Sequence, residues 1–349
     1  MKIDLKKYLE KVDAILISSN SNIIYLTSYS NFSISERECF LLITKNKRYL
    51  ITDKRYSEAL KRDLKDFEII DIGATRFLSN CSDFLKNLKI KKLGFEDDDL
   101  KVNEYTTLRK SVILSSVDLS DLRILKTQNE IKNIKSAANV SDKAFEFITK
   151  KLKVGVTEKE IAFILKQYIE EKSDGISFDP IVAFGENSSI PHHLSGNAKL
   201  KKNQIVLLDF GAKINNYSSD MTRTVFFGKA DHKFKEIYET VLQAQKLAIE
   251  KVKPGATGHE VDDAARDFIT SKNFSQIPHS VGHGIGINVH EKPYISPNSH
   301  KKISENMVFS IEPGIYITSS GGVRIEDLVL VTKSGVELIS NSKKEIIEI

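Results

Sequence analysis

The chain has 349 residues, of which 40% are hydrophobic and 28% are charged. These proportions exclude the disordered, collagenous and disulfide-rich classes, and the length suits two domains. The net charge is +5, but the 52 basic and 47 acidic residues are interspersed, without a basic block carrying interleaved aromatics. We therefore expect no nucleic-acid partner.

The sequence also shows neither the pattern of a targeting signal nor a cysteine motif. The first apolar run, Ala14–Ile17, is shorter than a signal peptide requires, and no run approaches the 18 residues of a membrane span. We expect a cytoplasmic protein that does not contact membranes. Cys39 and Cys81 lie far apart without a CxxC spacing, so they are expected to be reduced core thiols.

Residues 1–124 alternate short β-type runs with amphipathic helical patterns, which predicts a small α/β domain after an N-terminal helix. Lys45-Asn46-Lys47 separates two of the runs and indicates a hairpin. Strands are expected at Ala14–Ile17, Cys39–Thr44, Arg48–Thr52, Phe67–Ile70 and Lys92–Glu96, and helices at Arg55–Leu64 and Arg76–Leu88.

Residues 125–349 are predicted to form a second domain. Thr127 and Thr157 are each followed three residues later by Glu, the capping-box spacing that starts a helix. Two more helices are expected at about Asp231–Lys251 and Thr257–Lys272. Lys153-Val-Gly155 and Lys253-Pro-Gly255 each precede a Thr cap by two residues, so a duplicated unit with pseudo-twofold symmetry is predicted. Strands are expected around Ile205–Leu208, Val225–Phe227, Val308–Ile311 and Val329–Val331.

Two aspartates follow the first of these apolar strands. Asp209 stands at the strand end, and Asp220 arrives eleven residues later at the start of the next strand. Adjacent antiparallel strands would bring the two carboxylates together. Each alone has a simpler explanation, because Asp209 can cap a turn and Asp220 can pair with Arg223.

The segment from His279 to Pro293 holds three histidines within twelve residues. Glycines flank His283 and allow close backbone approach, while alternation over Gly286–His290 predicts a short strand that ends at His290. This pattern is typical of metal binding or acid-base chemistry; the alternative is a Gly-rich turn with surface histidines. A phosphate-binding loop is less favoured, because the following helix and the Lys-Ser/Thr pair are missing.

Two glutamates complete the set. Glu312 ends an apolar strand, where a buried carboxylate is costly unless it is paired or binds a cation. Glu326 follows on a later strand and shares a face with Arg324, which could orient a ligating carboxylate.

Together, four carboxylates and one imidazole carry about four negative charges, which would neutralise two divalent cations. Oxygen-rich ligation with one nitrogen suits Mn²⁺ or Co²⁺, and possible alternatives are Zn²⁺ and Fe²⁺. Two such ions about 3.5 to 4 Å apart lower the pKa of a shared water enough for nucleophilic attack at neutral pH. Metal-assisted hydrolysis is the expected reaction class.

These segments, in this order and spacing, resemble the pita-bread metallopeptidases, which include methionine aminopeptidase, prolidase and Xaa-Pro aminopeptidase. The resemblance covers residues 125–349 and implies an α/β (α+β) protein with a pita-bread catalytic domain. It implies that Asp209 binds one metal, His283 and Glu312 bind the other, and Asp220 and Glu326 bridge both.

The stretch Phe178–His193 resembles the substrate-binding segment of proline peptidases in that family. The resemblance implies that His192 holds the substrate or stabilises the tetrahedral intermediate, that His290 hydrogen-bonds the scissile carbonyl, and that Glu312 shuttles a proton. We also expect Arg324, which could orient a ligating carboxylate, to be one of the catalytic residues. Phe178 and Ile181 are candidates for the proline pocket, although they could equally be core residues.

The leading domain narrows the choice of substrate. Asn22–Tyr29 resembles a stretch of the creatinase/prolidase-like N-terminal domain, which methionine aminopeptidases of bacteria usually lack. Short proline-containing peptides and a homodimer are therefore implied. Prolidases often carry Arg after His-Glu-Xaa-Pro, whereas this chain has Tyr294, which binds a free carboxylate more weakly. We thus expect an Xaa-Pro aminopeptidase, with an Xaa-Pro dipeptidase as the alternative and a metal-free binding protein as a third possibility.

Overall fold

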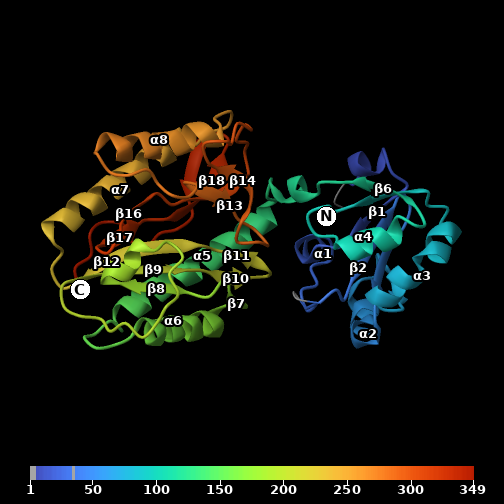
Figure 1. Ribbon diagram of the computed structural model, residues 1–349, viewed down its shortest axis with the longest axis horizontal. Coiled ribbons are helices and arrows are strands. Elements are labelled where there is room, and N and C mark those ends of the chain that lie inside the picture. The colour runs from blue at the N-terminus through green and yellow to red at the C-terminus, as the bar shows by residue number, and fades with distance from the viewer. Residues whose placement is uncertain (1–4, 34–35) are drawn as a thin grey trace. The chain divides into compact units, whose positions relative to one another are not determined.

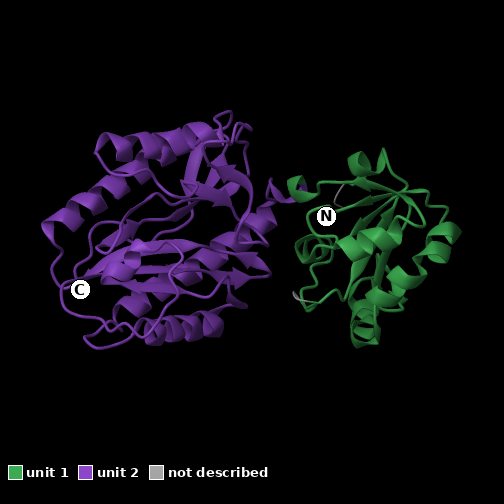
Figure 2. Cartoon of the chain, viewed as in Figure 1, with its two compact units in different colours: residues 1–121 green, residues 122–349 purple. Residues whose placement is uncertain are grey.

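The computed structural model describes residues 5–33 and 36–349. Two compact units divide the chain, residues 1–121 and residues 122–349 (Figure 2). The division falls three residues before the one expected after residue 124. No helix in the described part of the chain combines the length and apolarity that crossing a bilayer requires.

The first unit contains a six-stranded sheet in the order β4-β3-β2-β1-β5-β6. Its helices pack through apolar side chains, among them Phe77, Cys81 and Leu85 of α3. Both cysteines are free and buried, as predicted. The strands are β1 (Ala14–Ile17), β2 (Phe40–Thr44), β3 (Arg48–Thr52), β4 (Glu68–Asp71), β5 (Lys92–Phe95) and β6 (Ile113–Ser116), and the helices are α1 (Asn20–Thr27), α2 (Lys54–Asp63), α3 (Ala74–Asn87) and α4 (Val102–Leu108).

The predicted strands and the β2–β3 hairpin of this unit are confirmed. The expected N-terminal helix is reduced to a single 3₁₀ turn, Lys6–Leu9, among the described residues. The helices α1 and α4 and the strand β6 were not predicted. Their sequences are rich in Ser, Thr and Asn, whose side chains compete with backbone hydrogen bonds and obscure the hydrophobic periodicity.

Four long helices frame the second unit, and each begins beside a cap residue. Thr127, Thr157 and Thr257 each accept a hydrogen bond from the backbone N–H three residues later. The capping boxes predicted at Thr127 and Thr157 are confirmed, and the cap predicted at Thr257 forms one as well. The helices are α5 (Gln128–Thr149), α6 (Glu158–Lys172), α7 (His232–Lys251) and α8 (Gly258–Ser271).

The strands of this unit lie between α6 on one side and α7 and α8 on the other (Figure 1). The largest sheet has the order β14-β13-β15-β18-β19, two three-stranded sheets have the orders β12-β9-β8 and β11-β10-β7, and a two-stranded one has the order β16-β17. The strands are β7 (Gly175–Ile176), β8 (Ile181–Phe184), β9 (Gln204–Phe210), β10 (Ala212–Ile214), β11 (Tyr217–Ser218), β12 (Met221–Phe227), β13 (Gly282–Gly284), β14 (Glu291–Ile295), β15 (Val308–Ile311), β16 (Gly314–Ile317), β17 (Gly321–Arg324), β18 (Asp327–Thr332) and β19 (Gly335–Leu338).

Two apolar cores occupy corresponding positions in the two halves of this unit. One joins α5 and α6 to β8, β9 and β12, and the other joins α7 and α8 to β15 and β18. Matching backbone hydrogen bonds also recur: Gly155 donates to Leu200 and Gly255 to Ile303. The duplicated arrangement predicted from the sequence is therefore present. The strand ends that carry the candidate ligands lie between its two halves.

Candidate metal centre

Antiparallel pairing of β9 and β12 brings the two aspartates together. Asp209 lies opposite Thr222 in the register, and Asp220 immediately precedes β12. Both aspartates are buried, with 8% and 5% of their surface exposed. The apolar run Ile205–Leu208 forms the buried strand that carries Asp209 into the interior, as predicted.

His283 comes from β13, which pairs with β14 and β15. A Cβ on Gly282 would lie 1.9 Å from the carbonyl oxygen of Ser310, and one on Gly284 would lie 2.3 Å from that of Lys292. The flanking glycines thus permit a strand approach that no other residue allows. The His283 Nε2 atom lies 3.1 Å from Glu312 Oε1 and 3.7 Å from Asp220 Oδ2.

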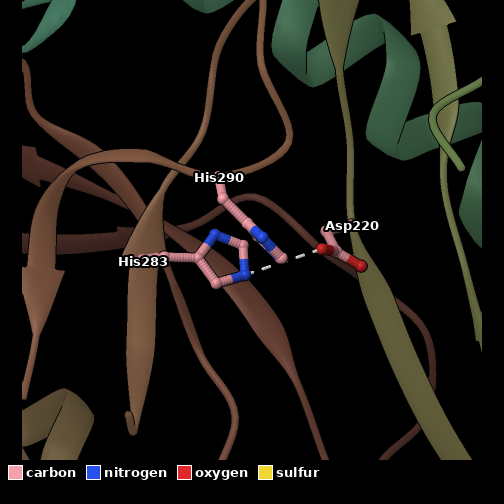
Figure 3. Close-up of side chains that lie close together, drawn as sticks. All are labelled: Asp220, His283 and His290. Atoms are coloured by element: carbon pink, nitrogen blue, oxygen red, sulfur yellow. Dashed lines mark ion pairs between the residues drawn. The ribbon is translucent and has the colours of Figure 1, made fainter. Parts of the chain in front are cut away.

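The five predicted ligands form two adjoining groups that share Glu326. Asp209, Asp220 and Glu326 form one, and His283, Glu312 and Glu326 form the other; within each, one candidate ligand atom per residue lies within 4.8 Å of the others. Asp220, His283 and His290 form a third such group, in which both imidazoles lie near the aspartate carboxylate (Figure 3). The His283 and His290 ring centres are 4.2 Å apart.

Three carboxylate oxygens in this cluster are buried without a hydrogen-bond partner within the described residues: Asp209 Oδ1, Asp220 Oδ1 and Glu326 Oε1. An unpaired buried carboxylate oxygen is unfavourable unless a cation lies beside it. All three atoms belong to one ligand group, so the residues fit a divalent cation. Carboxylate oxygens and imidazole nitrogens are donors that divalent metal ions take in proteins.

The electrostatics of the cluster also indicate missing positive charge. Burial raises the pKa of Asp220 well above its ordinary value, and burial together with Glu312 raises the pKa of Glu326 to about 8. Although burial opposes its charge, the hydrogen bond with Glu312 raises the pKa of His283 to about 9. Without a cation, protons neutralise part of the site, and bound metal would replace them.

Arg324 holds Asp209 in place. Its Nη2 atom donates to Asp209 Oδ2, and its Nη1 atom donates to the Tyr316 hydroxyl at 3.0 Å. Its Nε atom donates to Thr222 Oγ1, and the same hydroxyl donates to Glu326 Oε2 at 2.7 Å. Thr222 therefore connects Arg324 with the shared glutamate.

One alternative and one expectation about these strands are wrong. Arg223 pairs with Asp327 at 2.6 Å rather than with Asp220, so the simpler explanation for Asp220 does not hold. Arg324 and Glu326 do not lie on one continuous strand, because β17 ends at Arg324 and β18 begins at Asp327.

A third correction concerns His290. No strand covers Gly286–His290, and His290 lies instead in a bend just before β14. The buried carboxylate of Glu291 accepts hydrogen bonds from Arg123 and Lys126 at 3.0 and 2.8 Å, which fixes the chain beside His290. These long-range partners override the local alternation of polar and apolar residues.

A cavity of about 620 Å³ adjoins the cluster. All the predicted substrate-binding residues line it, which are Phe178, Ile181, His192, His290 and Tyr294, as do the five predicted ligands and Arg324. Phe178 and Ile181 are half-buried, so they are cavity wall rather than interior core. Pro191, Ser280 and Val289, for which no role was predicted, also line the cavity, as does His279, which was predicted only as part of the histidine-rich segment.

His279 joins the network of Arg324, although the sequence signalled only its proximity to His283. Its Nε2 atom lies 2.9 Å from the Tyr316 hydroxyl and its Nδ1 atom 2.8 Å from the Ser280 carbonyl oxygen. Burial lowers the pKa of His279, so the ring is neutral at pH 7. Nothing in the local sequence signals Tyr316, because its contacts arise only when β16 pairs with β17.

Buried carboxylates, an imidazole and an adjoining cavity define a hydrolytic metal centre, and the comparisons agree. Residues 132–333 match Metallopeptidase family M24, and residues 7–128 match the Creatinase/Prolidase N-terminal domain. The chain belongs to metallopeptidase family M24.

Its relatives in that family include proline peptidases. An Xaa-Pro dipeptidase of Pyrococcus horikoshii is 35% identical, with 99% of each chain covered. The structure of an Xaa-Pro dipeptidase from Bacillus anthracis superposes with a TM-score of 0.93 at 35% identity, covering 99% of this chain and 98% of that one. An X-Pro aminopeptidase from Thermotoga maritima superposes with a TM-score of 0.89 at 32% identity, covering 99% and 100%.

Proposed function

We propose that this metallopeptidase is an Xaa-Pro dipeptidase, which cleaves the bond before proline in dipeptides. The observation that carries the proposal is the single cavity in which both ligand groups meet His192 and His290. The similarity to Xaa-Pro dipeptidases over nearly the whole chain supports this substrate class. It reverses the order expected from the sequence, in which the aminopeptidase came first.

The proposed metal ligands are the five residues predicted from the sequence: Asp209, Asp220, His283, Glu312 and Glu326. Bound divalent cations, proposed to be Mn²⁺ or Co²⁺, supply Lewis acidity and make water nucleophilic at neutral pH. Asp209 would ligate on one side and His283 with Glu312 on the other. Glu326, which belongs to both groups, would bridge them, together with Asp220.

Side chains at the cavity wall would transfer the proton and stabilise the developing negative charge. Glu312 lines the cavity, and its side chain is 15% exposed, so it is suited to carry a proton from the attacking water to the leaving amine. Burial lowers the pKa of His290, which keeps the ring neutral and able to donate one hydrogen bond to the scissile carbonyl. His192 would stabilise the same developing charge, and Arg324 would keep Asp209 oriented.

An Xaa-Pro aminopeptidase is the second candidate, and Tyr294 favours it. Its side chain lines the cavity and the residue is 48% exposed. A phenol is a weaker partner than a guanidinium for the free carboxylate of a dipeptide. The similarity to the Thermotoga X-Pro aminopeptidase is consistent with this alternative.

Kinetics with matched peptides tests both proposals. The protein is stripped of metal with a chelator, refilled with Mn²⁺ or Co²⁺, and assayed with Xaa-Pro, Xaa-Pro-Yaa and Xaa-Ala peptides. The dipeptidase proposal predicts the highest kcat/KM for Xaa-Pro and little cleavage of Xaa-Ala. Preference for Xaa-Pro-Yaa would favour the aminopeptidase, and cleavage of no proline peptide would refute both.

A further inference from the structure

We infer that Glu158 is a positioning residue that holds the His192 segment at the cavity, an inference that rests on the role proposed for His192. Glu158 lies in the first turn of α6 and has no exposed surface. Its carboxylate accepts four hydrogen bonds from the segment that carries His192. The donors are Phe184 N and Asn187 Nδ2 at 2.8 Å to Oε1, and His193 Nε2 at 2.8 Å and Gly196 N at 3.0 Å to Oε2.

Apolar burial does not hold residues 189–199, the part of the segment that includes His192, although Phe184 at the start of the segment is buried. No residue from 189 to 199, all of which the structure describes, is buried. Ile190 is 52% exposed and Leu194 87% exposed, so these two apolar side chains near His192 contribute little burial, and Pro191 is only half-buried. Because the hydrophobic term scales with the apolar area removed from water, polar contacts must fix the segment instead.

Other polar contacts fix the two ends. Ser195 Oγ accepts from Val182 N at 2.8 Å, and Pro191 O accepts from Arg324 Nη1 at 3.3 Å. Backbone bonds from the start of α6 reach Gly196 and Ala198. The Glu158 carboxylate differs from these groups because it accepts a hydrogen bond from the side chain of His193, the residue adjacent to His192.

The second half of the fold shows that the helix itself does not require this carboxylate. Lys159 N donates to Gly196 O in the first half, and His259 N donates to Ser299 O in the second. The residue in the second half that corresponds to Glu158 is Gly258, where a Cβ would lie 2.6 Å from Tyr294 O. Since α8 begins with the same capping box and no carboxylate at this position, the buried charge of Glu158 serves the segment it binds.

A Glu158→Gln substitution isolates this function. A Gln side chain has nearly the same shape, but its NH₂ group would replace one acceptor oxygen and, on either side, would face a backbone N–H, that of Phe184 or of Gly196, which can only donate. A buried donor facing donors costs free energy, and the segment would relieve it by moving. Displacement of a substrate-contacting group by about 1 Å lowers the rate by up to about a hundredfold.

Glu160→Gln is the matched control. Glu160 lies in the same helical turn, is exposed, and accepts from Thr157 N at 2.7 Å without contacting the His192 segment. We expect Glu158→Gln to lower kcat/KM about tenfold or more with metal content retained, and Glu160→Gln to change it less than about twofold. In a His192→Ala background, Glu158→Gln should cause less than about a twofold further loss, because it acts through His192.

Two results would overturn the inference: an equally large loss from Glu158→Gln in the His192→Ala background, or loss of metal in the single variant. If Glu158→Gln does not fold, His193→Ala, which removes one of the four donors, should give a smaller loss with the same dependence on His192.

Amide hydrogen exchange of residues 189–199 gives a readout that does not depend on activity. It should be faster in Glu158→Gln and unchanged in Glu160→Gln, and unchanged exchange in both would refute the positioning role. If the wild-type protein cleaves no proline peptide, the proposed function fails, and the exchange result still decides whether Glu158 holds the segment.

Discussion

The Arg324 guanidinium donates to Asp209 Oδ2 and leaves Asp209 Oδ1 buried without a partner in the described part of the chain. One oxygen is thus fixed while the other remains available to a cation. Such an outer partner orients a ligand and lowers its mobility before metal arrives. The same guanidinium donates to Thr222, Tyr316 and the Pro191 carbonyl oxygen, so its planar shape matches four acceptors at once.

Arg324→Lys should therefore weaken metal binding although the charge is kept. A lysine ammonium cannot make the same set of bonds, and loss of such a partner typically costs about 10- to 100-fold in metal affinity or activity. Competition with a metal-sensitive chelator measures the affinity. Arg37→Lys is the control, because Arg37 also pairs with a buried carboxylate, Glu104, but lies in the first unit. Equal affinity in wild type and Arg324→Lys would contradict the orienting role.

Alanine variants should separate metal binding from later steps. We expect His283→Ala and Glu326→Ala to lose turnover together with metal, since each removes a ligand that serves a cluster of buried charges. His192→Ala should keep its metal and lose about a hundredfold in kcat, the magnitude typical of one removed transition-state donor. Elemental analysis beside the kinetic assay distinguishes the two classes. Loss of metal from the His192→Ala protein would show that His192 contributes to metal binding as well as to substrate binding.

Metal affinity should rise with pH. Burial raises the pKa of Glu326 to about 8, and Glu312 raises that of His283 to about 9, so both hold protons at pH 7 in the metal-free protein. Metal binding must displace these protons, and increasing pH removes them beforehand. Calorimetric titrations with Mn²⁺ in buffers of different ionisation enthalpy should show proton release at pH 7 and tighter binding at about pH 8 than at pH 6.

The stability of the metal-free protein should change in the opposite direction. A carboxyl whose folded pKa is raised stabilises the fold below its unfolded pKa and loses that contribution as pH rises through the folded value. For Glu326 the window runs from its ordinary 4.5 to about 8. His279 and His290, whose pKa values are lowered by burial, act in the opposite sense below their ordinary 6.5, so thermal unfolding without metal should shift to lower Tm as pH rises from about 7 to 8. A Tm that rises across this interval would show that Glu326 is already ionised.

The local signals in the sequence were sufficient to predict the starts of the four long helices of the second unit and to propose the ligands. A capping box depends on residues three positions apart, so Thr157 and Thr257 were readable without tertiary structure. A carboxylate at the end of an apolar strand is also a local signal, because burial of its charge demands compensation. Asp209 and Glu312 could be recognised for this reason.

Residues whose importance depends on distant partners could not be recognised in this way. Glu158 resembles an ordinary acidic residue in a first helical turn, and only folding brings residues 184–196 around it. Arg223 lies three residues after Asp220 in sequence, yet its partner Asp327 is 104 residues away. Sequence spacing does not determine such pairings, because they depend on how the two halves of the second unit pack.

The substrate choice depends most directly on Tyr294, and substitution can test it. Tyr294→Arg places a guanidinium at the cavity wall, where a charge-assisted hydrogen bond to a free carboxylate is worth about 1.5 to 3 kcal/mol. The ratio of kcat/KM for Xaa-Pro over Xaa-Pro-Yaa should rise about tenfold or more, mainly through a lower KM for the dipeptide. Because Tyr294 is 48% exposed, stability should change little.

Tyr294→Gln serves as the neutral control and should leave that ratio within about twofold. The comparison separates charge from the loss of the phenol ring, which both substitutions share. If Tyr294→Arg leaves the ratio unchanged, the dipeptide carboxylate must meet another group in the cavity. His192 is the first candidate, because it lines the cavity and has an exposed side chain that can donate to an anion. In that case the neutral Tyr294 would no longer favour longer peptides. The main observation in support of the aminopeptidase over the dipeptidase would then be removed.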